Sequence, residues 1–232
     1  MGMDNMNTIE SEDDLRKICT FCAEIKKQEQ YNLYCEMFGK QINYRYILKE
    51  TEHFLVIPPA GSFVPGYLEI IPKEHVPSFG KLSSKLDEEL TCLRILVEDW
   101  IKKYYSKYVI YFEHGSANFK NRGGSTSDHA HLHIVPVPKY VDLAPSLFRD
   151  FNPIKIIDFS AIHEQVKNGN PYLLYTHHDN IMYICDASNA KSQYFRRETL
   201  IQLGLEELWD WKTNLGRENI MKTIEMSEKY AF

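Results

Sequence analysis

The chain has 232 residues, of which 44% are hydrophobic, and it carries a formal net charge of -5 at pH 7. This length is enough for one large domain, or a compact domain with an extension, and for a proper core. The acidic balance argues against a broad electrostatic footprint for nucleic acid or an anionic membrane, so no extended nucleic-acid partner is predicted. A local pocket for one small phosphate ligand remains compatible with this charge.

The first residues, MGMDNMNTIESEDDLRK, lack the basic, apolar and small-residue segments of a secretory signal. Met6 stands where an N-myristoylation pattern requires Ser or Thr, and no apolar run approaches the roughly 18 residues that span a bilayer. The five cysteines have irregular spacing that does not resemble a disulfide framework, which favours a reducing compartment. The sequence therefore predicts a cytoplasmic protein without a membrane anchor.

Five segments in the first part of the chain predict strands, because each is rich in β-branched or aromatic residues and is bounded by proline, glycine or charge. They are 44–49, 54–57, 67–71, 109–113 and 130–137. One long helix is predicted over 83–105, with Ser84 and Asp87 as a capping box and Cys92 as a packed apolar residue. Its apolar residues at three- and four-residue steps are Leu86, Leu90, Leu93, Val97, Trp100, Ile101 and Tyr104.

After the segment PVPKYVDLAP, the sequence predicts short strands at 172–175 and 181–185, and helices within 192–205 and 216–230. A boundary near Lys139 divides the chain into a first domain, 1–138, and an accessory region, 139–232, that packs back on it. The order of these elements predicts a mostly antiparallel sheet with one long helix, followed by a C-terminal α/β extension.

Three histidines alternate with apolar residues in the stretch DHAHLHIVPVP. On a strand, His129, His131 and His133 project from one face, while Ala130, Leu132 and Ile134 project from the other into a core. Alternating imidazoles suit two chemistries, namely ligation of a catalytic zinc, or attack by the central imidazole on phosphorus while its neighbours hold phosphate oxygens. The pattern alone leaves both open.

The preceding loop, HGSANFKNRGGSTSD, favours a phosphate ligand over a metal cage. Gly123 and Gly124 let backbone N–H groups approach an anion, because glycine has no side chain in the way. Ser125, Thr126 and Ser127 add hydroxyl donors beside them.

The stretches HAHLHIV and FVPGYLEIIPKEHVPSF occur in the order found in the histidine triad family, which the chain resembles over 19–138. The resemblance implies an α+β fold class, and hydrolysis or transfer at the α-phosphate of a nucleotide through a covalent nucleotidyl-histidine intermediate. It assigns the nucleophile to His131, a phosphate hydrogen bond to His133, and phosphate contacts to the loop positions Ser125 and Thr126. It also implies a small-molecule nucleotide substrate and a homodimer.

The pair Cys19 and Cys22, in CTFC, is open to interpretation as a redox pair, as half of a zinc site or as chance. No strand precedes it, which disfavours a thioredoxin-like motif and favours a structural zinc. By resemblance to the zinc-bearing histidine triad proteins and galactose-1-phosphate uridylyltransferases, the other two ligands are His75 and His129. Cys35 is a competing ligand.

The C-terminal region resembles the extension of CwfJ-like relatives of the histidine triad proteins, some of which are linked to RNA processing. Arg196 and Arg197 are expected in solvent by default, with at most one of them reaching a phosphate. Two alternatives to a nucleotidyl-histidine enzyme stay open. One is a non-catalytic module that binds a nucleotide or an RNA end, and the other is a hydrolase with a catalytic zinc.

Overall fold

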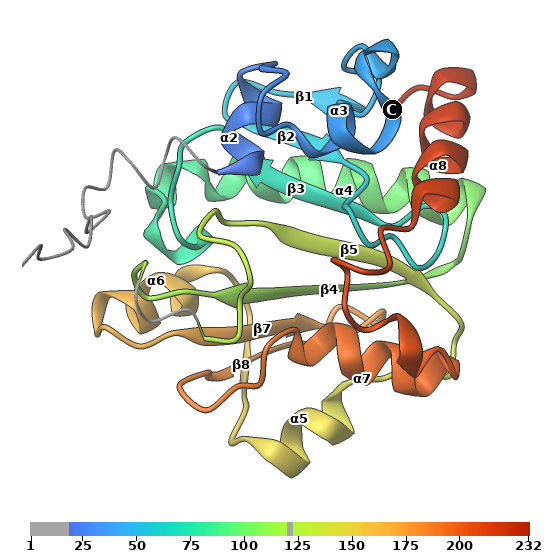
Figure 1. The fold of residues 1–232 in the computed structure, drawn as a ribbon. Helices are drawn as coiled ribbons and strands as arrows, with labels where there is room; N and C mark the ends of the chain where they lie inside the picture. The colour runs from blue at the N-terminus through green and yellow to red at the C-terminus, as the bar shows by residue number, and fades with distance from the viewer. Residues whose placement is uncertain (1–18, 120–122) are drawn as a thin grey trace, which may run out of the picture.

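The computed structural model describes residues 19–119 and 123–232, whose strands form one antiparallel sheet with helices on both faces (Figure 1). The eight strands have the spatial order β1-β2-β3-β5-β4-β7-β8-β6. Their bounds are β1 Lys49–Glu50, β2 Phe54–Ile57, β3 Leu68–Pro72, β4 Tyr108–Gly115, β5 Leu132–Val137, β6 Ile154–Ile156, β7 Tyr172–Thr176 and β8 Met182–Asp186. The predicted α+β class with an antiparallel sheet is confirmed.

The described α-helices are α2 Thr20–Ile25, α3 Leu33–Phe38, α4 Asp87–Tyr104, α5 Ala144–Asp150, α6 Ser160–Lys167, α7 Tyr194–Leu203 and α8 Arg217–Lys229. Four short 3-10 helices join them, η1 Lys40–Ile42, η2 Phe79–Lys81, η3 Ser84–Leu86 and η4 Glu206–Leu208. The N-terminal stretch considered above for targeting signals, including Met6, lies outside the described residues.

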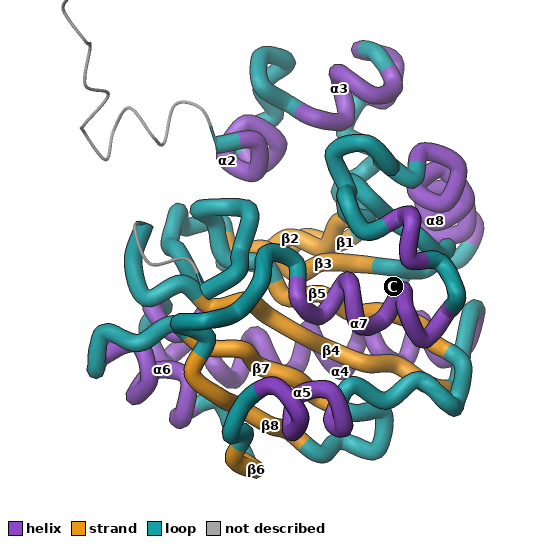
Figure 2. The backbone as a smooth tube through the Cα atoms, turned by 60° about the horizontal axis from the view of Figure 1, so that its bottom comes forward, coloured by secondary structure: helices purple, strands orange, loops and turns teal. Residues whose placement is uncertain are grey.

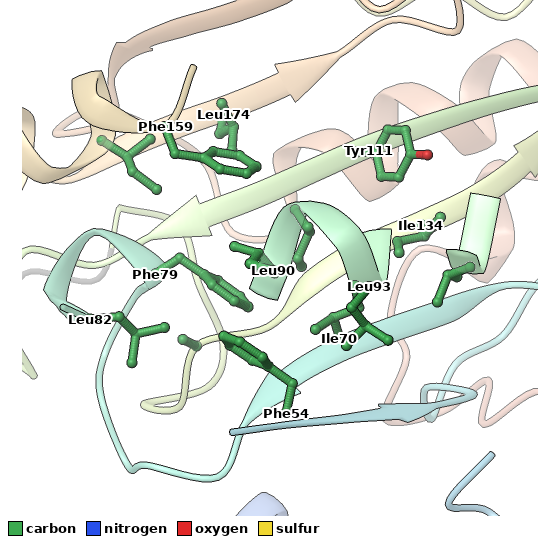
Figure 3. Packing of buried hydrophobic residues seen from close by; sticks show 14 of the residues in the cluster. Phe54, Ile70, Phe79, Leu82, Leu90, Leu93, Tyr111, Ile134, Phe159 and Leu174 are labelled. Atoms are coloured by element: carbon green, nitrogen blue, oxygen red, sulfur yellow. The ribbon is translucent and has the colours of Figure 1, made fainter. Parts of the chain in front are cut away.

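Helix α4 covers one face of the sheet, with α6 beside it. Every member of its predicted apolar stripe, from Leu86 to Tyr104, packs into the cluster on this face. Figure 3 shows Leu90 and Leu93 against Ile70 and Ile134 of the sheet. Because side chains alternate along a strand, Leu132 and Ile134 enter this core, and the neighbouring His133 is left on the opposite face.

The opposite face carries two separate apolar layers. Over β2 and β3, the N-terminal helix α3 and the C-terminal helix α8 pack through Tyr34, Met37, Ile220 and Ile224. Over β4, β5 and β7, the helices α5 and α7 form the second layer (Figure 2). The polar residues of β3 and β5 lie between these layers.

Three local predictions are wrong. Segment 44–49 is largely a turn, because Asn43 and Tyr44 adopt left-handed backbone angles, and only its last residue enters β1. Ser84 does not cap α4. The hydroxyl of Ser83 accepts from the N–H of Lys85 instead, because a 3-10 turn precedes the helix. Cys92, predicted as a packed apolar residue, is instead exposed on α4.

The strand that carries the triad segment begins two residues later than predicted. Strand β5 starts at Leu132, so His129 and His131 precede it and only His133 lies within it. The predicted strands at 54–57, 67–71, 109–113, 172–175 and 181–185 are each present with shifts of at most two residues.

The C-terminal region continues the sheet of the first part of the chain. Strand β7 pairs with β4 from Tyr111↔Thr176 to Gly115↔Tyr172, and β8 and β6 follow outward. The boundary near Lys139 stays a prediction about the chain's organisation, and the sheet is continuous across it. Within the described residues, none of the helices combines the length and apolar character that crossing a membrane requires.

Two glycines test how tightly this C-terminal region docks. Gly216 and Gly204 both have φ +68, but a Cβ at Gly216 would lie 2.2 Å from the carbonyl oxygen of Ser62, whereas one at Gly204 would meet nothing within 4 Å. We expect Gly204→Ala to lower the free energy of unfolding by about 1 kcal/mol, the cost of a left-handed alanine. Gly216→Ala should cost more than about 3 kcal/mol, because a backbone contact must also shift.

Urea unfolding of the two variants measures both values. Equal losses for Gly204→Ala and Gly216→Ala would mean that the contact with Ser62 has no energetic weight.

Candidate functional site

A cavity of about 370 Å³ lies where the two apolar layers leave the sheet uncovered. Strand register builds its floor, because Glu69 of β3 and Phe112 of β4 are both direct cross-strand neighbours of His133 in β5. Its walls come from the N-terminal segment, the β2–β3 loop, the loop before the triad, and the C-terminal region. The cavity therefore collects residues from almost the whole length of the chain.

His131 lines this cavity and has a defined tautomer. Its Nδ1 lies 2.8 Å from the backbone oxygen of His129. Because a carbonyl only accepts, Nδ1 carries the proton, and Nε2 keeps its lone pair. Burial, assisted by the neighbouring His133, lowers the pKa of His131 to about 4. The imidazole is therefore neutral and nucleophilic around pH 7.

His133 is held by two partners on one ring nitrogen. Its Nδ1 lies 2.7 Å from the hydroxyl of Tyr67 and 2.8 Å from a carboxylate oxygen of Glu69, which leaves Nε2 as the nitrogen available to a ligand. Burial lowers the pKa of His133 to about 3, and Arg196 adds to this shift. Burial also raises the pKa of Glu69 to about 7, against the smaller lowering effects of His131 and Arg196.

His114 is a third histidine of the cavity, beside His131 and His133, and the sequence patterns above did not point to it. It lies one residue beyond the predicted strand 109–113, inside β4. Its Nε2 accepts from the backbone N–H of Phe195, and its ring centroid is 6.4 Å from that of His133. Burial lowers the pKa of His114 well below its usual range. The alternation of side chains along β4 places His114 on the same face as Phe112. A predicted strand that continued past residue 113 would have put His114 on this face.

Gly124, Ser125 and Thr126 all line the cavity, as the sequence predicts for its phosphate loop. The hydroxyl of Ser125 donates to the carbonyl oxygen of Ser127, at 2.9 Å, and this bond closes a tight turn. The hydroxyl oxygen of Thr126 accepts from the indole N–H of Trp211, at 3.2 Å. The C-terminal region thus contacts the loop directly.

Arg196 is buried in the cavity wall, which corrects the expectation that it lies in solvent. Its guanidinium donates to the carbonyl oxygens of Gly61 at 2.7 Å, Leu208 at 2.8 Å and Trp209 at 2.8 Å. Because Gly61 belongs to the β2–β3 loop, this side chain ties the C-terminal region to the opposite wall. Arg197 lies outside the cavity and stacks on Trp209.

Cys19, Cys22, His75 and His129 come together at the edge of the cavity, with their ligand atoms all within 4.8 Å of one another. The Sγ of Cys22 lies 3.1 Å from Nδ1 of His75 and 3.6 Å from Nδ1 of His129. Cys19, at the start of α2, completes the group with its Sγ 3.6 Å from Nδ1 of His129. This cluster does not include the competing Cys35.

The protonation pattern of this cluster fits a metal. Nε2 of His129 lies 2.7 Å from the carbonyl oxygen of Pro72, so Nε2 carries the proton and Nδ1 presents its lone pair to the sulfurs. The hydrogen bond from Cys19 lowers the pKa of the Cys22 thiol well below its usual range, which supplies the thiolate that a metal requires. The residues therefore form a four-ligand site that could hold a metal ion.

No family model and no curated protein matches the chain. Among solved structures it is similar to a HIT-like protein involved in cell-cycle regulation from Bartonella henselae, at 17% identity and a TM-score of 0.35, over 57% of this chain and 92% of that chain. It is also similar to a hypothetical histidine triad nucleotide-binding protein from Sulfolobus tokodaii, at 23% identity and a TM-score of 0.40, over 65% and 88%.

A third match is yeast Ap4A phosphorylase Apa2 in complex with AMP, at 13% identity and a TM-score of 0.37, over 60% of this chain and 58% of that chain. The chain is thus structurally similar to histidine triad proteins, the family that its motif resembles. All three TM-scores are below 0.5, so the activity of this chain is inferred from its own residues. The CwfJ-like resemblance of the C-terminal region stays a prediction.

The raised pKa of Glu69 predicts a pH dependence of stability. The folded state holds the Glu69 proton up to a pH of about 7, while the unfolded carboxyl releases it near its ordinary pKa of 4.5. The contribution of Glu69 is therefore most favourable below pH 4.5 and is lost as the pH rises toward 7. Relative to the wild type, Glu69→Gln should gain up to about 3 kcal/mol in free energy of unfolding between about pH 4.5 and pH 8.

Urea unfolding at several pH values measures this difference. A parallel pH profile for wild type and Glu69→Gln would show that Glu69 has an ordinary pKa in the folded protein.

The four-ligand cluster predicts that Cys19→Ser releases a bound metal. A serine hydroxyl is a poor ligand, so we expect metal content to fall from about one ion per chain to well below that, with a lower Tm. Metal analysis after gel filtration and a thermal melt measure the two effects. The matched control is Cys35→Ser, a half-buried cysteine outside the cluster, which should keep its metal. Wild-type protein that is folded without metal would refute the site.

Proposed function

We propose that this chain is a nucleotide hydrolase or nucleotidyl transferase acting at the α-phosphate of a nucleoside 5′-phosphate derivative. Dinucleoside polyphosphates and nucleoside phosphoramidates are the candidate substrates. The observation that carries the proposal is the bond from Nδ1–H of His131 to the backbone oxygen of His129, at 2.8 Å. This bond leaves the Nε2 lone pair of a neutral imidazole in a cavity beside an anion-binding loop.

In the first step, Nε2 of His131 attacks the α-phosphorus. A nitrogen–phosphorus bond forms as the bond from phosphorus to the leaving group breaks, and a departing amine nitrogen takes a proton from solvent. The product is a covalent nucleotidyl-histidine. A neutral imidazole suits this task because it is a far better nucleophile than water toward an anionic phosphate.

His133 and the loop would stabilise the charge that gathers on the phosphate oxygens. Nε2 of His133 can donate to an oxygen when its Nδ1 accepts a hydrogen bond from the hydroxyl of Tyr67 or from a protonated Glu69, whose pKa of about 7 allows that state. Gly124 and Ser125 add backbone N–H groups and Thr126 adds its hydroxyl, while the hydroxyl of Ser125 donates to Ser127 and holds the turn. Such donors are already oriented before the reaction, so they stabilise the transition state at little reorganisation cost.

In the second step, water or another acceptor attacks the same phosphorus. The new bond to oxygen replaces the bond to His131, and the proton of the attacking water passes to the imidazole or to solvent. With water as acceptor the product is a nucleoside monophosphate. Two easier displacements thus replace one difficult attack by water.

We propose that the metal of the Cys19, Cys22, His75 and His129 cluster is a structural zinc. Two thiolates and two imidazoles are a tetrahedral ligand set that zinc favours. Bound zinc would supply structural order, by joining the start of α2 to the segment that carries His131. The reaction itself would be carried by the side chains in the cavity.

A second candidate function is a hydrolase with a catalytic metal. It is favoured by one observation, that Glu69, His131 and His133 also offer ligand atoms within 4.8 Å of one another. Three protein ligands and an open position are the pattern of a catalytic zinc site. In that case exhaustive chelation would abolish turnover, and no nucleotidyl-histidine could be trapped.

A third possibility is a module that binds a nucleotide or an RNA end without turnover.

The cytoplasmic location and the homodimer stay predictions from the sequence.

The proposal predicts that His131→Asn abolishes turnover. Purified wild type and variant are incubated with dinucleoside polyphosphates and nucleoside phosphoramidates, and nucleoside monophosphate is followed by chromatography. We expect a loss of at least about 10³-fold, because the covalent route disappears. His178→Asn, outside the cavity, is the matched control and should retain full activity.

Acid quenching of the wild type should trap nucleotide on the protein, at His131. Nucleotide binding without turnover by either protein would favour the binding module instead.

A further inference from the structure

Gln193, the residue immediately before helix α7, enters the cavity from the C-terminal region. It lines the cavity together with His114, His131 and His133, and it is buried, with 8% of its surface exposed. None of the roles proposed above uses it.

The side-chain oxygen of Gln193 has no hydrogen-bond partner among the described residues. This atom, Oε1, is buried. A buried amide that is left unpaired is unfavourable, because its hydration is lost and nothing replaces it. Water or a ligand in the cavity can satisfy this oxygen, and a bound ligand that displaces the water has to replace its hydrogen bond.

The backbone holds Gln193 in an unusual conformation. Its φ of 58° and ψ of 37° lie in the left-handed region, which residues other than glycine rarely adopt. The position is fixed from both sides, since its N–H donates to the oxygen of Gly124 at 3.0 Å and its own oxygen accepts from the N–H of Arg197 at 2.9 Å. Retained strain of this kind is typical of residues that have a ligand to contact.

The location of Gln193 indicates which part of a substrate it would meet. The N-terminal side of the cavity is largely apolar, with Phe21, Leu33 and Ile57 beside the buried carboxyl of Glu24, and suits a nucleoside. Gln193 comes from the opposite layer, and its backbone is bonded to the phosphate loop at Gly124. With the nucleoside on the apolar side and the phosphate on the loop, the leaving group is the part of the substrate that would lie nearest to Gln193.

We propose that Gln193 is a specificity-determining contact to the leaving group, and that the preferred leaving groups carry a hydrogen-bonding amide or hydroxyl. This inference rests on the proposed nucleotidyl-histidine reaction and deepens it. The amide would act in the first step only, because the leaving group has departed before the second. It would change the choice between substrates more than the reactivity of His131.

The test uses two phosphoramidates of whichever nucleoside gives the strongest turnover. Their leaving amines are 4-aminobutanamide and pentylamine, which have similar lengths and differ in hydrogen bonding. The variant Gln193→Gly removes the amide and relieves the left-handed backbone, so it should fold at least as well as the wild type. Gln193→Met keeps the volume of the side chain and removes only its hydrogen bonding.

We expect the wild type to favour the amide-bearing substrate, and both variants to lower that kcat/KM ratio about tenfold, the worth of one hydrogen bond. Hydrolysis of the trapped nucleotidyl-histidine should proceed at the wild-type rate. Asn180→Gly is the matched control, since Asn180 is also left-handed and lies in the β7–β8 turn away from the cavity.

Two results would overturn the inference alone, namely an unchanged substrate ratio in both variants, or an equal slowing of both steps with both substrates. The second would place the amide on the phosphate itself. Absence of a nucleotidyl-histidine in the wild type is a different failure. It would overturn the proposed function, and the role of Gln193 with it.

Discussion

The site depends on the hydrogen bonds of one residue, His129. Its ring Nε2–H donates to Pro72, which turns Nδ1 toward the sulfurs of Cys19 and Cys22. Its backbone oxygen accepts from His131 and so fixes the tautomer of that ring. The metal cluster and the proposed nucleophile are therefore coupled through a single residue. Any movement of His129 changes both, because neither set of bonds can shift independently of the other.

The cavity exists because two apolar layers cover one face of the sheet and leave a gap between them. The N-terminal segment and α8 form one layer over β2 and β3, and the C-terminal region forms the other over β4, β5 and β7. Arg196 joins the two sides by donating to Gly61 across the gap. The polar groups in this gap are largely desolvated, which keeps His131 and His133 neutral and raises the pKa of Glu69.

Several residues of the site carried a clear signal in the sequence, and others carried none. The alternation of His129, His131 and His133, the glycine-rich loop and the Cys-X-X-Cys pair are local patterns, so spacing alone suggested their chemistry. Glu69 carried no such signal, because it pairs with His133 only through the register of β3 against β5. Gln193 and Arg196 were equally hidden, since their burial depends on how the C-terminal region docks.

The sequence by itself determined the long amphipathic helix, most of the strands and the alternation of the triad histidines with apolar residues. These features follow from periodicity, which depends on neighbours a few residues away. Only the tertiary structure decided that the C-terminal region extends the same sheet, that Glu69 lies opposite His133, and that Gln193 faces the cavity. Such contacts are fixed by strand register and by packing between distant segments, and no local pattern records either.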